Sequence, residues 1–251
     1  MLAAFNKSVV DAPQELVSLP VGADGGSDMR KTEKQLADIF VSTQPQTTSF
    51  TLGPHGFMAY THHKEGLLMP RSFGVVDDVF CVFVGALRNL PLLRQDYGLT
   101  KNANEVMVTI EAFKALRDRG PFPADQVLNH FEGSFAFVLF DSSSKTLMVA
   151  SDIEGKCSLF WGCTSDGSLA FSDDDQVLKN GCGTSFAPFP AGCYFSSMKG
   201  LQSYEHPFNK MKAVPRVDST GQMCGSTFVV DSAKKGNIPH VSSEANWSQD
   251  I

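Results

Sequence analysis

The sequence lacks the features that mark several large classes of protein. Its longest apolar stretch, residues 135–140, is far too short to cross a bilayer. The start has neither a basic segment followed by a long apolar region nor an Arg- and Ser-rich amphipathic pattern, so no secretory signal or transit peptide is apparent. There is no basic run, and the net charge is −6. These absences predict a cytoplasmic protein, with the nucleus as a further location, that binds neither membrane nor nucleic acid.

Cysteine spacing excludes the usual zinc motifs, because no two cysteines form a Cys-x-x-Cys pair. The six cysteines are Cys81, Cys157, Cys163, Cys182, Cys193 and Cys224. In a reducing compartment we expect free thiols, most of them buried as small hydrophobic residues. His62-His63 is the other candidate for metal binding, but neighbouring residues of a strand point to opposite faces, which favours an exposed loop pair. We therefore predict no metal and no cofactor.

What the sequence does contain is ample core material: 42% of its 251 residues are hydrophobic, and twenty are Phe. Apolar periodicity predicts helices at 32–40, 105–119, 123–131 and 173–179, with a helical turn at 13–16. Strands are expected at 1–5, 79–87 and 192–196, and as a pair within 47–61. Four apolar runs between 135 and 172 predict an antiparallel meander covered on both faces, hence an α+β layered domain.

The apolar pattern fades beyond residue 215, apart from an island at 227–230. We therefore predict a domain over 1–215 and a C-terminal extension over 216–251 that is partly disordered.

Four motifs in a fixed order carry a resemblance to a known family. They are Gly133-Ser134-Phe135-Ala136-Phe137, Ala150-Ser151-Asp152 with Gly155, Leu159-Phe160-Trp161-Gly162, and Phe189-Pro190-Ala191-Gly192. Together they resemble the class II glutamine amidotransferase domain at the N-terminus of asparagine synthetases, over roughly residues 1–210. This resemblance implies the fold of N-terminal-nucleophile hydrolases, a four-layer αββα sandwich.

Two further motifs and the first three residues narrow the resemblance. Tyr97-Gly98-Leu99, Leu116-Arg117-Asp118-Arg119 and the Met-Leu-Ala start are similar to a plant family, the aluminium-induced proteins with YGL and LRDR motifs. For two charged segments, the residues themselves leave two interpretations open. Arg117 and Arg119 are either anion or partner contacts, or cations that complement the end of a helix. The run Asp173-Asp174-Asp175 either binds a divalent cation or caps the helix that follows it.

The resemblance also implies what this chain has lost. The catalytic cysteine of the amidotransferases corresponds to Leu2, whose bulk should also hinder removal of Met1. The oxyanion-hole Asn corresponds to Val84, and only Gly85 keeps a backbone N–H; one lost donor costs on the order of 3 kcal/mol of transition-state stabilisation. The acidic residue that grips the glutamine α-amino group corresponds to Ala103. The clamp for the substrate carboxylate has at most a remnant in residues 53–56, without its Arg.

These losses favour a non-catalytic relative of the amidotransferases that binds a small metabolite or a protein partner, with Leu2 filling the old cleft. The resemblance to the aluminium-induced family implies a role in metal and other stress responses. A homodimer is the default among oligomers. The rival hypothesis is an amide hydrolase or thiol-dependent enzyme that uses Cys157, in a turn beside Lys156, or Cys81 in an apolar strand. A purely structural subunit is the third alternative.

Overall fold

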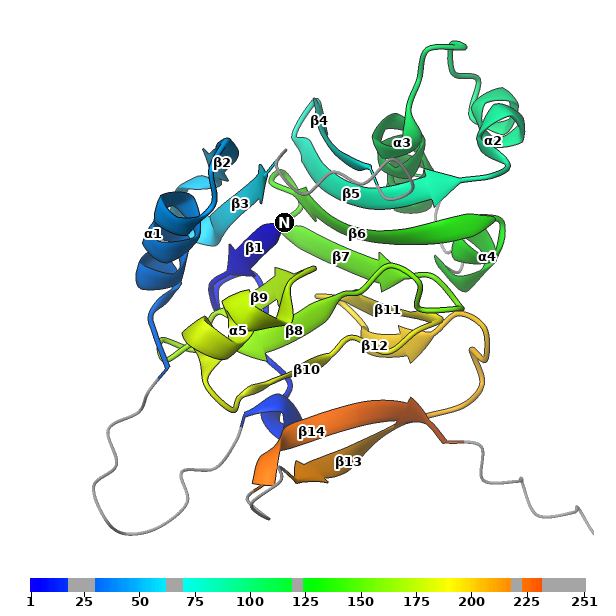
Figure 1. Ribbon diagram of the computed structural model, residues 1–251. Helices are drawn as coiled ribbons and strands as arrows, with labels where there is room; N and C mark the ends of the chain where they lie inside the picture. Colours follow the sequence, from blue (N-terminus) through cyan, green and yellow to red (C-terminus); the bar gives the residue numbers. More distant parts are fainter. Residues whose placement is uncertain (18–29, 62–69, 119–123, 218–222, 232–251) are drawn as a thin grey trace, which may run out of the picture.

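A computed structural model of the protein describes residues 1–17, 30–61, 70–118, 124–217 and 223–231 (Figure 1). The α-helices are α1 (Glu33–Thr43), α2 (Leu90–Asp96), α3 (Glu105–Asp118), α4 (Ala124–Asn129) and α5 (Asp175–Cys182), and two 3-10 turns are η1 (Gln14–Leu16) and η2 (Gly53–His55). The strands are β1 (Leu2–Phe5), β2 (Thr47–Thr51), β3 (Gly56–Thr61), β4 (Arg71–Val76), β5 (Val79–Leu87), β6 (Gly133–Asp141), β7 (Thr146–Ser151), β8 (Phe160–Cys163), β9 (Leu169–Ser172), β10 (Phe186–Pro188), β11 (Cys193–Ser196), β12 (Gly200–Ser203), β13 (Met211–Val217) and β14 (Met223–Val230).

The strands form two stacked six-stranded sheets and a separate hairpin. One sheet has the order β10-β8-β9-β1-β3-β2 and the other β12-β11-β7-β6-β5-β4, while β13 pairs with β14. In Figure 1, α1 and α5 lie beside the first sheet, and α2, α3 and α4 lie on the far side of the second. Hydrophobic residues fill all three spaces between these four layers. The predicted αββα sandwich is confirmed.

Alternation along the strands decides which space each side chain enters. In β5, Val82 and Val84 belong to the core between the sheets, whereas Cys81 and Phe83 pack toward α3. Because both faces of the sheets are covered, these strands read as continuous apolar runs rather than as alternating polar and apolar residues.

The predicted meander over 135–172 is corrected by the sheet order. Its four runs do form β6, β7, β8 and β9, but β6 pairs with β7 in one sheet and β8 with β9 in the other. The chain therefore crosses between the sheets after β7. Apolar runs on both sides of the crossing look alike because each is buried on two faces.

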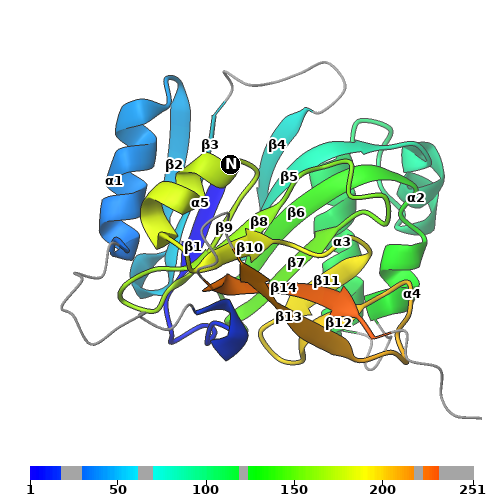
Figure 2. The same ribbon diagram turned by 60° about the horizontal axis from the view of Figure 1, so that its bottom comes forward.

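The C-terminal part of the described chain forms an antiparallel hairpin, β13–β14, which runs across residues 215–216 (Figure 2). The apolar island at 227–230 is the end of β14. Arg216 fixes the hairpin to the sandwich, because its Nη2 donates a hydrogen bond to the Phe186 carbonyl at 2.7 Å and its guanidinium lies over the Phe186 ring. Residues 232–251 lie outside the described part.

Candidate functional site

The start of β1 places Met1, and not Leu2, in the space between the sheets. The Met1 side chain belongs to the inter-sheet core together with Val84. Leu2 is fully buried on the other face of its sheet, where it packs with Leu36 and Phe40 of α1. The expectation that Leu2 fills the old cleft is therefore wrong. Adjacent residues of a strand point to opposite faces, so the residue before Leu2 takes the inward position.

Three charged groups contact one another at the start of the chain: the Met1 α-amine, the Arg71 guanidinium and the Asp173 carboxylate. We call them the N-terminal ion cluster. The amine donates to Oδ1 of Asp173, while Nε of Arg71 donates to Oδ2 of the same carboxylate at 2.6 Å and Nη2 donates to it as well. The side chains of the three residues are only 1, 9 and 7% exposed. Burial lowers the pKa of the α-amine, although the Asp173 carboxylate opposes this effect.

The positions of the old oxyanion hole face this cluster. Val84 lies directly opposite Arg71 in the β4–β5 pairing. The Gly85 N–H, the one donor that the sequence left in place, donates to the Pro70 carbonyl at 2.9 Å. A side chain at Gly85 would clash with the Ser134 carbonyl, so glycine is required there by the close approach of β6. The arrangement thus offers a reacting carbonyl neither the side-chain amide nor a free Gly85 N–H.

Cys157 lies close by but in the wrong electrostatic setting for a nucleophile. Its thiol donates to the Val84 carbonyl at 3.6 Å, and it is 3% exposed. Burial, together with the carboxylates of Asp152 and Asp173, raises the pKa of the thiol to about 12. The sequence placed Lys156 beside it as an activating cation, but Lys156 pairs with Glu154 at the surface. A thiolate at Cys157 is therefore disfavoured at neutral pH.

Cys81 is the other thiol that the sequence singled out. It is fully buried on the face of β5 that packs toward α3, away from the inter-sheet core. Burial raises the pKa of its thiol far above the ordinary value. Five cysteines carry thiols rather than disulfide bonds: Cys81, Cys157, Cys163, Cys182 and Cys193.

The remaining predicted site positions are not part of this cluster. Ala103 is buried in the connection between α2 and α3, where its carbonyl accepts a hydrogen bond from Nε of Arg94 at 2.6 Å. The remnant at residues 53–56 contains the 3-10 turn η2. It lies at the far end of β1 from Met1, since Phe5 pairs with Gly56. His62-His63 lies outside the described residues. Within the described part of the chain, no group of His, Cys, Asp or Glu side chains is arranged to hold a metal ion.

The run of three aspartates divides between two roles. Asp174 is the N-cap of α5 and accepts from the Gln176 N–H at 3.0 Å, and Asp175 lies in the first turn, as the capping interpretation predicted. Asp173 instead belongs to the N-terminal ion cluster. Neither this role nor that of Arg71 was predicted. The available signal was the pattern Val75-Val76-Asp77-Asp78-Val79, in which a two-residue turn joins β4 to β5 and so brings Arg71 opposite Val84.

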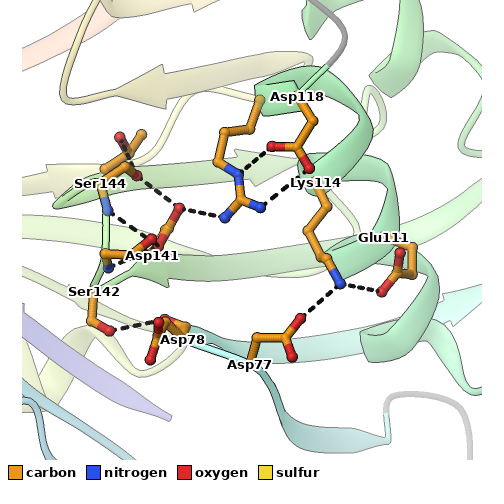
Figure 3. A network of polar contacts seen from close by, with 11 residues as sticks. Asp77, Asp78, Glu111, Lys114, Asp118, Asp141, Ser142 and Ser144 are labelled. Atoms are coloured by element: carbon orange, nitrogen blue, oxygen red, sulfur yellow. Dashed lines mark hydrogen bonds and ion pairs between the residues drawn. The ribbon is translucent and has the colours of Figure 1, made fainter.

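The LRDR segment forms a second ion cluster on the opposite layer (Figure 3). Arg117 donates from Nη1 to Oδ2 of the fully buried Asp141 at 3.0 Å, and from Nε to Asp118 at 2.7 Å. Asp141 also accepts hydrogen bonds from the hydroxyls of Ser143 and Ser144, each at 2.7 Å. Burial opposes ionisation of Asp141, but these bonds outweigh it and lower its pKa to about 2. Arg117 thus ties α3 to the β6–β7 turn, while Arg119 lies outside the described residues.

The YGL segment ends a helix. The Leu99 N–H donates to the Arg94 carbonyl at 2.7 Å and the Gly98 N–H to the Gln95 carbonyl at 3.1 Å, which is the hydrogen-bond pattern of a Schellman motif. Gly98 has a φ of +66°, a conformation that favours glycine. Tyr97 and Leu99 pack against the core on the α3 side. The Tyr97-Gly98-Leu99 segment is therefore a turn whose aromatic ring is partly buried.

A cavity of about 440 Å³ lies beyond the far end of β1. It is bounded by residues of the 10–15 segment, of β11 and β12, and of the β13–β14 hairpin. Its apolar residues include Phe195, Leu201 and Phe228, and exposed carboxylates of Asp11 and Glu15 also line it. The volume falls in the range of about 300–1,000 Å³ that is usual for small-molecule pockets. This cavity could not be predicted from the sequence, since its walls come from three distant segments.

Comparison with known proteins assigns the family. The family model described as aluminium induced protein matches residues 2–230. The chain belongs to this family. The stem-specific protein TSJT1 of Nicotiana tabacum is 46% identical over 150 residues, which cover 60% of this chain and 99% of that protein. The plant family predicted from the YGL and LRDR motifs is thus confirmed.

The relation to amidotransferases is more distant. A glutamine-hydrolysing asparagine synthetase of Oryza sativa subsp. japonica is 37% identical over 84 residues, which cover 33% of this chain and only 14% of the synthetase. Among solved structures, a glutamine phosphoribosylpyrophosphate amidotransferase from B. subtilis matches 63% of this chain and 36% of its own, at 14% identity and a TM-score of 0.46. A glutamine aminotransferase class-II domain protein from Silicibacter pomeroyi matches 80% of this chain and 88% of its own, at 10% identity and a TM-score of 0.41.

No helix in the described ranges has the length and apolar character needed to cross a membrane.

Proposed function

We propose that this member of the aluminium induced protein family is a non-catalytic relative of the class II glutamine amidotransferases that acts by binding. Its occupant would be a small metabolite or a protein partner, and its role would lie in the plant response to aluminium and other metals. The sequence relation to asparagine synthetases supports the ancestry. The family description supports the link to aluminium.

One observation carries the proposal against catalysis. In an N-terminal nucleophile, the α-amine serves as the base. Here the α-amine is buried and donates a hydrogen bond to Asp173, and the residue that bears it is Met1, whose side chain is a thioether. A thioether cannot attack an amide carbon as a thiolate does. The oxyanion positions agree, because Val84 has no donor and the Gly85 N–H is already bonded.

The direct test is ammonia release. The purified full chain is incubated with glutamine and a panel of other amides, with and without prior thiol alkylation. We expect ammonia at the background rate under every condition. Turnover that is well above background and is lost on alkylation would overturn the proposal.

A Cys157→Ser variant separates this proposal from an enzyme with altered chemistry. The Cys157 thiol lies in the inter-sheet core and contacts the Val84 carbonyl, so thiol-dependent hydrolysis at the old oxyanion position would depend on it. Cys81→Ser is the matched control, because that thiol packs on the opposite face of β5. We expect the wild type and both variants to give the same background rate.

We further propose a cytoplasmic protein that also enters the nucleus and forms a homodimer. Fractionation of plant cells and light scattering of the purified chain test these two expectations. Exclusive recovery in another compartment, or a strictly monomeric mass across the concentration range, would contradict them.

A further inference from the structure

The N-terminal ion cluster contains one hydrogen-bond donor, Nη1 of Arg71, that has no partner among the residues that the structure describes. Nε and Nη2 of Arg71 both donate to Asp173, but Nη1 is buried and has no hydrogen-bond partner among the described residues. The side chain is only 9% exposed. Buried guanidinium nitrogens without a partner are rare, since each carries N–H groups that lose their water on burial. An orphaned donor of this kind indicates an acceptor oxygen that binds there.

The position of this donor ties it to the old cleft. Arg71 is paired across the sheet with Val84, and its guanidinium shares the Asp173 carboxylate with the Met1 α-amine. The Cys157 thiol contacts the Val84 carbonyl, and its pKa is influenced by the Asp173 charge. Arg71 is therefore tied to two residues of the inter-sheet core, to Val84 by the strand pairing and to Met1 through the shared carboxylate.

The charges of the cluster select the kind of acceptor. Two cationic groups, the Met1 amine and Arg71, share the single carboxylate of Asp173. Asp174 acts on the amine from a greater distance, but its own carboxylate is bonded to the first turn of α5. Within the described part of the chain, one planar guanidinium nitrogen of Arg71 has no partner. A single planar donor suits one oxygen of a carboxylate better than a tetrahedral anion that needs several donors.

We propose that Arg71 is the anchor of a binding site for a small carboxylate, with Nη1 donating to one carboxylate oxygen. The site deepens the proposed binding function and rests on it. Asp173 is the positioning residue: it holds Nε and Nη2 so that Nη1 faces the ligand. Met1 and Val84 supply the apolar wall against which the rest of the ligand packs.

Calorimetric titration of the full chain tests this site. The probes are acetate, propionate and L-glutamate, with inorganic phosphate as the tetrahedral anion, all at constant ionic strength. We expect saturable binding of at least one carboxylate and none of phosphate. Arg71→Lys should weaken that binding about tenfold or more, because the lysine ammonium can still pair with Asp173 but leaves no planar donor for the ligand.

The Lys variant also guards against misfolding, since it keeps the ion pair with Asp173. Arg88→Lys is the matched control at an exposed site on the neighbouring turn, and it should bind as the wild type does. Failure of every carboxylate to bind the wild type, or equal affinity in the Arg71→Lys variant, would overturn the proposal. A crystal structure grown in acetate that shows only water on Nη1 would do the same. These outcomes are independent of ammonia release, so the site and the absence of catalysis can fail separately.

Discussion

Two Arg–Asp bridges, each with a buried aspartate, lie on opposite sides of the second sheet and differ in how fully the arginine is paired. Asp141, in the LRDR cluster, accepts from Arg117 and from two serine hydroxyls, and Arg117 has Asp118 as a further partner. In the N-terminal ion cluster, one aspartate pairs with two cations, and Nη1 of Arg71 has no hydrogen-bond partner in the described ranges. The Arg117–Asp141 bridge holds α3 to the β6–β7 turn. The Arg71–Asp173 bridge holds its arginine in place for the proposed carboxylate ligand.

The largest expected effect follows from the loss of Asp173. Asp173→Ala leaves the Met1 amine and Arg71 buried without a counter-charge, so we expect the free energy of unfolding to fall by about 3–5 kcal/mol. Urea denaturation measures it. Asp174→Ala is the matched control, since it removes the neighbouring carboxylate, which caps α5. Loss of such a helix cap costs about 1 kcal/mol. Equal losses in the two variants would show that the ion cluster contributes nothing special.

Loss of Asp141 should cost less. Asp141→Asn keeps the size of the side chain but removes the charge that Arg117 and two hydroxyls contact, and we expect a loss of about 2 kcal/mol. Arg117 retains Asp118, and the serines lie in a turn that water can reach. Asp118→Asn, at an exposed site, should change stability less than Asp141→Asn does. The reverse order would contradict the central place given to Asp141.

The pH dependence of stability sharpens this prediction. The pKa of Asp141 falls from 3.8 to about 2 on folding. A depressed pKa stabilises the fold above pH 3.8, and the contribution of about 2 kcal/mol disappears as pH falls from there toward 2. Melting curves between pH 5 and 2 should therefore fall more steeply for the wild type than for Asp141→Asn. Parallel curves would mean that Asp141 does not titrate as described.

The smallest effect is expected at the YGL turn. Gly98→Ala places a side chain in the left-handed region, and because no atom lies within 4 Å of the added Cβ, the cost is backbone strain alone. We expect a loss of about 1 kcal/mol in the free energy of unfolding. Gly98→Asn should lose less, since asparagine tolerates this conformation. A loss well above that of Asp141→Asn would show a role beyond ending α2.

Much of this architecture could be predicted because its elements carry strong local signals. The stripe of α3 and the apolar runs of β5 and β6 lie where periodicity placed them. The division of four strands between two sheets was missed, since doubly covered strands look alike in either sheet. Strand β4 was missed as well, and Arg71 with it.

The candidate site shows the same limit. The lost donor at Val84 could be inferred from one position, but the bonded state of the Gly85 N–H depends on Pro70, a distant residue that only the β4–β5 hairpin brings near. Leu2 was assigned to the wrong face because the register of β1 is set by its partners β3 and β9. Cys157 looked reactive beside Lys156, but sequence proximity does not reveal where a flexible lysine finds its partner.

The most direct test of the account is the intact mass of the native protein, with sequencing of its first residues. The N-terminal ion cluster requires Met1 to be retained and its α-amine to be unmodified, since that amine donates to Asp173 in a buried site. We predict that Met1 is retained and that its α-amine is not acetylated. Loss of Met1, or an acetyl group on its amine, would contradict the account.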